Sequence, residues 1–532
     1  MLTGEKALRF LALATLAVSM ALGSAACRTT TDDVDRWANT AQGPRKLIAV
    51  LTHDKFPLDL RVEAALSLIR MKPRGGRAVG LQGSDEQIGL IDALSHLPAA
   101  GRTQIVTRLA PRLEEAMKRA PAPGEGDESF PYKDAAFAIL THDEGALVTD
   151  EKVRSQLRAA LAGWVIGNFS ERMDNSSQLY GLEQVLRELK ADGVRPLPDL
   201  VAENPKKIDR IASLVAELGD AETKVRTAET LVAVGRKVDS PAWIKEKQPV
   251  VEAANQASKL NPTPEQFRAQ LDQYQEEELL RVFSSMKQVG QAPIVDYLLA
   301  YARNANNSEK RRAAALAALE GNLNRNDARH AQAILAIASD KETPDGVRDV
   351  ALRRVAEMPR QLVVEDLYRL FSDENWKVRW VAAELVLQMS QTEHLSEFMQ
   401  KLGAVKNLAL TEPLRYGALI AKLKGSPKPP ALVDAFAERD NPAPARLAAL
   451  GYYYDQGTPS ELSKVQVHAT DGARVPRCSE DVEGCEWRCA IGEGQNQELK
   501  EIATVGDFVQ YCVEPAMRKR SNSEPKKAKG AD

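Results

Sequence analysis

The stretch DENWKVRWVAAEL, residues 373–385, contains a polar turn followed by the start of a helix. Residues 362–371 come just before it and carry apolar side chains at the spacing of one helical face. A second helix is expected from about Lys377 to about Met389, after the turn. The stretch therefore predicts two helices joined by a tight turn.

An Asp in the turn, an Arg six residues later and small residues after the Arg make this hairpin resemble the HEAT repeat; here the pair is Asp373 and Arg379. Three other pairs have the same or nearly the same spacing: Asp54 with Arg61, Asp220 with Arg226, and Asp440 with Arg446. Three further Arg occupy the equivalent place without such an Asp: Arg312, Arg348 and Arg415. From Arg312 to Arg446 the intervals are 36, 31, 36 and 31 residues, which fits one hairpin per repeat.

Two short antiparallel helices cannot bury both apolar faces alone, whereas stacked hairpins bury them between neighbours. Ala stands three residues after six of the seven Arg, where a small side chain lets adjacent layers approach closely. We expect the turn Asp to cap the second helix, and the Arg to reach the Asp of its own or the next layer. The fold class expected is an all-α solenoid of stacked helical hairpins, in which these Asp and Arg are structural.

The N-terminus has the features of a secretory signal. Lys6 and Arg9 precede an apolar run over residues 10–22, which is shorter than the ~20 residues that span a bilayer. Small residues at 24–26 suit cleavage by a signal peptidase. Residues 1–26 are therefore expected to be a signal peptide, and the mature chain to be exported.

Cys27 follows directly, and the segment resembles the signal of bacterial lipoproteins, in which such a Cys becomes the lipidated first residue. The sequence departs from that family at Ser24, where the family prefers Leu. The resemblance implies a lipid anchor on Cys27 and, because Arg28 rather than Asp follows, transport to the outer membrane, facing the periplasm. Cleavage after Ala26 without lipidation, which would give a soluble periplasmic or secreted protein, is the alternative.

The chain of 532 residues is too long for one core, which stops growing near ~250–300 residues. Thr263 and Pro264 have the pattern of a helix cap and first helical residue. The expected parts are a signal peptide, 1–26; a lipid-anchor Cys and flexible tether, 27–43; diverged helical repeats, 44–205, with an exposed loop at 120–132; HEAT-like repeats, 206–460; a disulfide-stapled module, 461–516; and a disordered basic tail, 517–532.

The five Cys are an odd number, so one is left over unless Cys27 carries lipid. The other four lie in a segment expected to form a small α+β module, with a strand at residues 464–468: Cys478, Cys485, Cys489 and Cys512. Such a module needs staples, and two disulfides are expected in an exported protein. Of the three possible connectivities, Cys478–Cys485 with Cys489–Cys512 is the preferred hypothesis. A zinc site is the alternative, although the spacing matches no paired Cys-x-x-Cys knuckle.

Motifs for chemistry are absent from the sequence. It contains no His-Glu-x-x-His zinc motif, no phosphate-binding loop and no nucleophile elbow. The formal net charge of −3 gives no global attraction to nucleic acid. We therefore expect no enzyme, no cofactor, no metal, no nucleic acid and no small-molecule substrate. Trp376 and Trp380, at helical spacing, are a candidate recognition patch, with packing between repeats as the alternative.

The function expected from these features is a non-catalytic scaffold of the bacterial cell envelope. Stacked repeats offer an extended curved face that is typically used for binding, so the partner would be another envelope protein, with the membrane reached through the lipid anchor. A structural envelope component without a discrete partner is one alternative. An enzyme or cofactor-handling protein of the HEAT-like type is the other. The C-terminal module is expected to cap the stack, or else to bind a ligand of its own.

Overall fold

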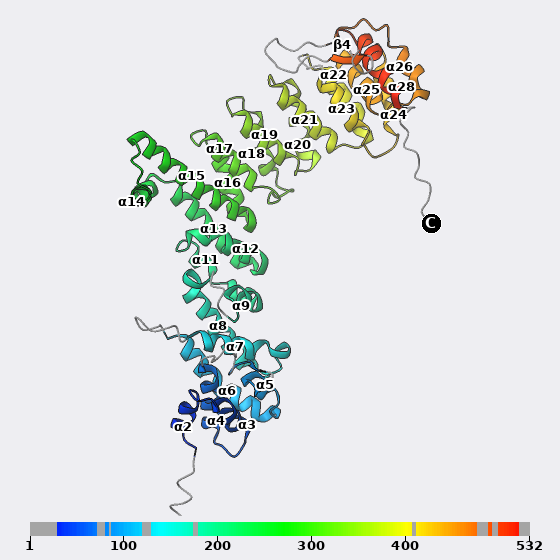
Figure 1. Ribbon diagram of the computed structural model, residues 1–532. Helices are drawn as coiled ribbons and strands as arrows, with labels where there is room; N and C mark the ends of the chain where they lie inside the picture. Colours follow the sequence, from blue (N-terminus) through cyan, green and yellow to red (C-terminus); the bar gives the residue numbers. More distant parts are fainter. Residues whose placement is uncertain are drawn as a thin grey trace, which may run out of the picture. The chain divides into compact units, whose positions relative to one another are not determined.

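The computed structural model is a succession of helices joined mostly by turns (Figure 1). It describes residues 29–71, 80–84, 87–119, 129–173, 179–406, 411–475, 488–491 and 498–520, with backbone only at 84, 87, 172 and 411–415. The chain divides into two compact units between Thr230 and Leu231. The expected signal peptide, Cys27, Cys478, Cys485, residues 120–128 of the expected loop and residues 521–532 of the expected tail lie outside the described residues. The rest of that loop, 129–132, and of that tail, 517–520, is helical, and the segment expected to be a flexible tether contains a helix over Thr31–Trp37.

The first unit consists of helices and one small hairpin of strands. Its helices are α2 (Thr31–Trp37), α3 (Gly43–Thr52), α4 (Leu58–Arg70), α5 (Leu90–Ser95), α6 (Ala99–Met117), α7 (Ser129–Thr141), α8 (Glu151–Arg172), α9 (Leu182–Leu189), α10 (Ala191–Val194), α11 (Leu197–Leu200) and α12 (Ile208–Leu218). Strands β1 (Gly83–Ser84) and β2 (Gln87–Ile88) pair antiparallel. Helix α4 packs on α6, and α6 packs on α8, so alternate helices form one layer. Helix α13 (Ala221–Val238) runs across the boundary to the second unit.

The second unit is a regular stack of hairpins. Its helices are α14 (Pro241–Ala257), α15 (Pro264–Val289), α16 (Ala292–Arg303), α17 (Glu309–Ala318), α18 (Ala328–Ser339), α19 (Asp345–Val355), α20 (Arg360–Arg369), α21 (Trp376–Gln388), α22 (Leu395–Gly403), α23 (Thr411–Ile420), α24 (Pro429–Ala437) and α25 (Ala443–Gln456). Each odd-numbered helix from α15 to α25 contacts the next odd-numbered one, and we call this row the second-helix layer. The expectation of an all-α solenoid is thereby confirmed.

Small residues set the spacing between successive layers. Ala315, Ala351, Ala382 and Ala449, each three residues after a repeat Arg, are completely buried. A Cβ atom added at Gly417 of α23 would lie 2.2 Å from the carbonyl carbon of Gly451 in α25. The backbones of these two helices are therefore in direct contact, and a larger side chain at either glycine would push the layers apart.

Local sequence signals fix where several helices begin. Thr263 caps α15 in a capping box with Gln266, and Pro264 is the first helical residue, as the sequence predicts. Asp150 accepts hydrogen bonds from the backbone N–H groups of Lys152 and Val153 and so caps α8. These caps satisfy donors that the first turn of a helix leaves without intrahelical partners.

The C-terminal module closes the stack after α25. It contains α26 (Leu462–Gln466), the antiparallel strands β3 (Arg488–Ile491) and β4 (Glu498–Glu501), α27 (Val505–Phe508), the π-helical turn η7 (Val509–Val513) and α28 (Glu514–Arg520). The strand expected at residues 464–468 is wrong, because residues 464–466 belong to α26 and residues 467–468 form the turn after it. The alternation of polar and apolar residues in this segment does not correspond to a buried face, since Val465 is fully buried but Val467 is 61% exposed.

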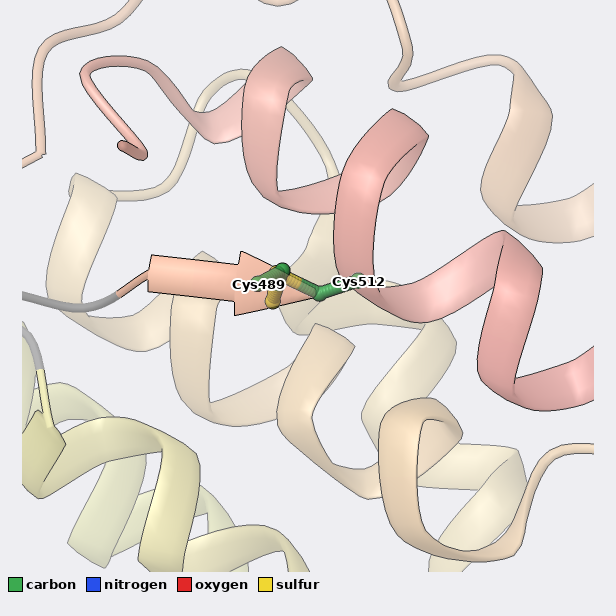
Figure 2. Close-up of a disulfide and its surroundings, with 2 residues drawn as sticks. All are labelled: Cys489 and Cys512. Carbon is green, nitrogen blue, oxygen red and sulfur yellow. A yellow bond between two sulfur atoms is a disulfide. The ribbon is translucent and has the colours of Figure 1, made fainter. Parts of the chain in front are cut away.

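A disulfide joins Cys489 of β3 to Cys512 of η7, which lie 23 residues apart in the sequence (Figure 2). Disulfides form and persist in oxidising compartments, so this bond indicates an extracytoplasmic location. Among the described residues, no helix is both long and apolar enough to cross a lipid bilayer.

Candidate binding surface

Several of the repeat Arg side chains form hydrogen bonds within their own hairpins. Three of them donate from Nε to the carbonyl oxygen ten residues earlier, as Arg61 to Leu51 at 2.8 Å, Arg312 to Ala302 at 2.8 Å, and Arg348 to Ala338 at 2.9 Å. Each acceptor lies at the end of the first helix of the hairpin, where carbonyl groups lack intrahelical partners. The Arg therefore bonds the end of the first helix to the second helix.

The same guanidinium groups also reach the next hairpin. Arg312 donates from Nη2 to the Thr343 hydroxyl at 3.2 Å. Arg348 donates from Nη2 to the Asp373 carboxylate at 2.5 Å. The buried side chain of Arg446 pairs with the buried carboxylate of Asp471, after α26. The first two of these bonds link one hairpin layer to the next, and the third links α25 to the C-terminal module. The charged and polar groups involved therefore hold the stack together.

The remaining members of the Asp and Arg set behave differently from one another. Asp220 accepts from the backbone N–H of Thr223 at 2.8 Å and so caps α13. Arg379 donates to the carbonyl of Asp373 in its own turn at 2.6 Å. Arg226 pairs with Asp199 at 2.8 Å on an exposed surface.

Three of the four Asp expected to cap a second helix do not cap it. Asp373 accepts from the backbone N–H of Asn375 at 2.9 Å, and the side chain of Asn375 caps α21 instead. The Asp54 side chain is 95% exposed beside His53, and α4 starts after Pro57 without a side-chain cap. Asp440 is exposed, and α25 starts after Pro442, also without a side-chain cap. The side chain of Arg415 lies outside the described residues.

A groove of about 250 Å³ opens between α19 and α21 in the second-helix layer. Its lining residues are Asp345, Gly346, Asp349, Leu352, Asn375, Lys377, Val378 and Val381. Leu352 and Val378 are buried and provide an apolar floor, while the polar and charged residues form the rim. Apolar pockets with a few polar groups at the edge are suited to holding a side chain of a partner.

Trp376 and Trp380 lie on α21, next in sequence to the groove residues Lys377 and Val381. Their rings are stacked, with centroids 6.3 Å apart and planes inclined by 17°. Both side chains are half-buried. Trp is among the residues that contribute most to binding at protein interfaces, so this pair and the groove together form the candidate binding surface.

The sequence did not reveal the groove residues. Asp345, Asp349 and Lys377 are ordinary charged residues near helix starts, and they come from hairpins about one repeat apart. No short motif marks them, because the groove exists only once the two hairpins have stacked. The Trp pair was the one signal in the sequence that pointed to this surface.

Lys133 in α7 is a buried cation that the sequence also did not reveal. Its side chain is completely buried, with Nζ 5.6 Å from the ring centre of Phe130 and 5.3 Å from that of Trp164. Nζ donates to the Tyr180 carbonyl at 2.5 Å and to the neighbouring Asp134 carboxylate. Burial raises the pKa of Asp134 even though the Lys133 cation opposes that shift. The cluster joins α7 and α8 to the start of α9.

A polar cluster clamps α15 in the second unit. The Tyr301 hydroxyl donates to Asp239 at 3.0 Å, and Arg311 donates to Gln275 of α15 at 3.1 Å. Gln275, itself buried, donates to the Val238 carbonyl at 2.7 Å. Burial, and then the Asp239 carboxylate, raise the pKa of Tyr301. This phenol therefore stays protonated and acts as a hydrogen-bond donor.

The described residues contain no group of three or more His, Cys, Asp or Glu that could hold a metal ion. Because Cys489 and Cys512 are joined in a disulfide, these two thiols are not available as zinc ligands.

A known family matches part of the chain. The sequence profile described as the vitellogenin TPR domain matches residues 194–382. This region covers about a third of the protein and includes α11 to the first half of α21. TPR units are helical hairpins that stack, in agreement with the stack of hairpins described above. No curated protein matches the sequence.

Two solved structures are similar to the protein at low scores. A crystal structure of a Kap121p mutant has 11% sequence identity and a TM-score of 0.27, over 82% of this chain and 43% of that chain. A crystal structure of importin beta has 12% identity and a TM-score of 0.24, over 82% of this chain and 67% of that chain. The protein therefore spans less than half the length of the Kap121p chain. These scores carry no inference about function.

Proposed function

We propose that the protein is an exported, non-catalytic scaffold of the bacterial cell envelope that binds another envelope protein through its second-helix layer. The groove between α19 and α21 is the observation that supports this proposal most directly. Its apolar floor, Leu352 and Val378, lies beneath an open polar rim. The stacked Trp pair lies on α21, the helix that carries Val378. An opening of this kind fits a side chain presented by a partner better than a free polar metabolite.

The contrast between buried, paired charged residues and exposed ones supports the same function. The buried repeat Arg and Asp are engaged between or within layers, as in the pair of Arg348 with Asp373. The charged groups that remain at the surface of α19 and α21, such as Asp345 and Lys377, are exposed. Interfaces of protein complexes combine such a polar rim with an apolar centre.

The proposal includes a lipid anchor on Cys27 that holds the scaffold at the outer membrane, facing the periplasm. It is supported by the sequence of the N-terminal segment and by the odd Cys that remains if the other four pair. Intact mass of the purified mature chain tests it, since lipid adds mass to a chain that begins at Cys27. A mature chain of unmodified mass would overturn the anchor and leave the binding function untouched.

Site-specific photo-crosslinking tests the binding function. A photo-reactive amino acid at Lys377, on the rim of the groove, is expected to capture one reproducible envelope protein in living cells. The matched control places the same amino acid at Lys206, an exposed site in the first unit. The variant Val381→Glu is expected to abolish the capture, because a charge would then stand in the apolar groove. Val250→Glu, at a side chain 51% exposed on α14, is expected to preserve it.

The proposal fails if position 377 captures no protein more often than position 206 does. It also fails if Val381→Glu, folded as judged by its circular dichroism, captures the same partner as the unmodified chain.

A further inference from the structure

A second and larger groove lies at the opposite end of α21. Its volume is about 480 Å³, and it lies between the C-terminal ends of α21 and α23. The lining residues are Leu387, Gln388, Met389, Ser390 and Gln391 from the first end, and Leu419, Lys422, Leu423 and Lys424 from the second. Leu387 and Leu423 are buried, so the floor is apolar, whereas both lysines are exposed.

Backbone contacts hold the two sides of this groove together. The backbone N–H of Thr392 donates to the carbonyl of Lys424 at 3.0 Å, which links the turn after α21 to the turn after α23. Gly425 follows with a φ of +132°, a conformation that residues with a side chain rarely adopt. A Cβ atom at this position would stand 3.2 Å from the Thr392 hydroxyl. The shape of the groove is thus set before anything binds, which lowers the entropy cost of binding.

The rim of this groove carries two exposed lysines, Lys422 and Lys424. Some lysines elsewhere in the stack pair with a Glu about one repeat away, as Lys287 does with Glu320 at 2.6 Å and Lys341 with Glu374 at 2.5 Å. In the described part of the chain, no carboxylate lies within ion-pair distance of Lys422 or Lys424. The groove therefore presents two positive charges that no carboxylate among the described residues neutralises.

Helix dipoles favour the groove residue Lys422 but not Lys428, which follows the groove in the sequence and does not line it. Lys422 follows the C-terminal end of α23, where a cation is favourable. Lys428 is the N-cap residue of α24, at the positive end of that helix, where a cation is unfavourable. The lysines of this segment thus do not follow the pattern that helix stability alone would favour.

We propose that this groove binds an acidic segment of a partner protein, with one apolar side chain inserted between Leu387 and Leu423 and carboxylates facing Lys422 and Lys424. The free positive rim over an apolar floor complements a peptide of that composition. The groove lies at the other end of α21 from the candidate binding surface. The proposal rests on the proposed function only in that the ligand is a protein.

Fluorescence anisotropy with short peptides and the full mature chain tests the proposal. The probe is a fluorescein-labelled peptide, Glu-Asp-Glu-Leu-Glu-Asp-Glu, and its matched control has Ser in place of the central Leu. The acidic peptide with Leu is expected to bind, and the Ser peptide to bind more weakly. Raising the salt concentration is expected to weaken both, since exposed charges are screened.

Two variants separate the charge from the apolar floor. The double variant K422E/K424E is expected to weaken binding of the Leu peptide by about tenfold or more. Gln388→Trp, which places a bulky side chain over the groove without changing the charge, is expected to weaken it as well. The control K152E/K206E changes the net charge by the same amount at exposed sites in the first unit, and is expected to bind normally.

The proposal is overturned if the Leu peptide does not bind the unmodified chain. Equal weakening by K152E/K206E and K422E/K424E would also overturn it, because it would mean that net charge alone governs binding. Photo-capture at position 377 distinguishes this failure from failure of the proposed function. A K422E/K424E chain that loses the peptide and still captures the partner at position 377 supports two separate sites.

Discussion

Arg348 and Asp373, which belong to consecutive hairpins, form an ion pair in the interior of the stack. Nη2 of Arg348 donates to Oδ2 of Asp373 at 2.5 Å, and the side chains are 4% and 6% exposed. Nε of Arg348 is bonded to the Ala338 carbonyl, and Oδ1 of Asp373 accepts from the Asn375 N–H at 2.9 Å. Buried charges are tolerated when they are paired and hydrogen-bonded in this way.

Removing one member of this pair is expected to destabilise the stack locally. Arg348→Met keeps most of the side-chain volume but leaves the Asp373 carboxylate buried without its cation, at a cost of about 3–5 kcal/mol. Because each repeat contacts only its neighbours, the loss should concentrate around α19 and α21. Hydrogen exchange measured by mass spectrometry should show faster exchange there, together with a lower urea midpoint.

Arg353→Met is the matched control for this prediction. Arg353 is on the same helix, but its pair with Asp349 is exposed, with side chains 69% and 44% exposed. Exposed pairs contribute at most about 1 kcal/mol. Equal losses of stability in the two variants would contradict the view that the buried pair holds the layers together.

The positions of the repeat Arg could be predicted from the sequence, but their contacts could not. Intervals of 31 and 36 residues indicated one Arg per layer from Arg312 to Arg446. The bond from Nε to the carbonyl ten residues earlier depends on how the two helices of a hairpin cross. Arg312 bonds to the Thr343 hydroxyl, whereas Arg348 in the next layer bonds to the Asp373 carboxylate, so the same type of contact is made with two kinds of residue.

Other features of the sequence were less informative. Asp54, Asp373 and Asp440 have the spacing of the repeat, or nearly so, but make no cap, because Pro57, Asn375 and Pro442 are the N-cap residues of the following helices instead. The strand expected at residues 464–468 rested on alternation alone, and no sheet is present there for it to join. Neither groove could be predicted, since each is lined by residues from two hairpins that are unremarkable one by one.

Loss of the disulfide is expected to loosen the C-terminal module without unfolding the stack. The bond between Cys489 and Cys512 closes a loop of about two dozen residues, for which the chain-entropy estimate is about 3 kcal/mol. Cys489 is also the one residue of β3 and β4 that is buried. Hydrogen exchange in Cys489→Ser should therefore rise in these strands and in η7, while α16 to α19 stay protected.

Peptide mapping without reduction provides a direct check of the same bond. A peptide pair containing Cys489 and Cys512 is expected, and a pair containing Cys478 and Cys485 is the sequence prediction for the other two Cys. Recovery of Cys489 as a free thiol, or joined to another Cys, would contradict the structure. Rapid exchange throughout the second unit of Cys489→Ser would show instead that the disulfide supports the whole stack.

The cap of α18 is expected to lose its stabilising charge in acid. Asp327 accepts from the side chain of Arg329 at 2.6 and 3.1 Å and from its backbone N–H at 2.9 Å. These bonds lower the pKa of Asp327 from 3.8 to about 2. A carboxyl group whose pKa is lower in the folded state stabilises the protein above its unfolded pKa, and this contribution disappears as the pH falls from about 4 to about 2.

Asp327→Asn isolates the charge, because Asn is also a good N-cap residue. The unmodified protein should have the higher Tm at neutral pH, and the difference should shrink below about pH 4 as Asp327 becomes protonated. Thermal unfolding over a series of pH values measures this difference. A constant gap from pH 7 down to about pH 2 would mean that the carboxylate gains nothing from its bonds to Arg329.

Deleting the C-terminal module is expected to expose the apolar end of the stack. Arg520 donates to the carbonyls of Tyr453 at 3.2 Å and Gly457 at 2.6 Å, at the end of α25. The Phe508 ring lies 6.1 Å from that of Tyr454, and Phe508 itself is completely buried. A chain that ends at Gly457 would leave this face of α25 uncovered, and solenoids need capped ends to remain soluble.

Size-exclusion chromatography with light scattering distinguishes the two roles considered for the module. The chain ending at Gly457 is expected to aggregate, whereas a control ending at Arg520, which keeps every described residue of the module, should run as the full-length protein does. If the shorter chain instead stays monodisperse and loses capture of a partner, the module is a recognition element. The bonds of Arg520 to α25 would then serve to orient that element, because the stack would have proved stable without them.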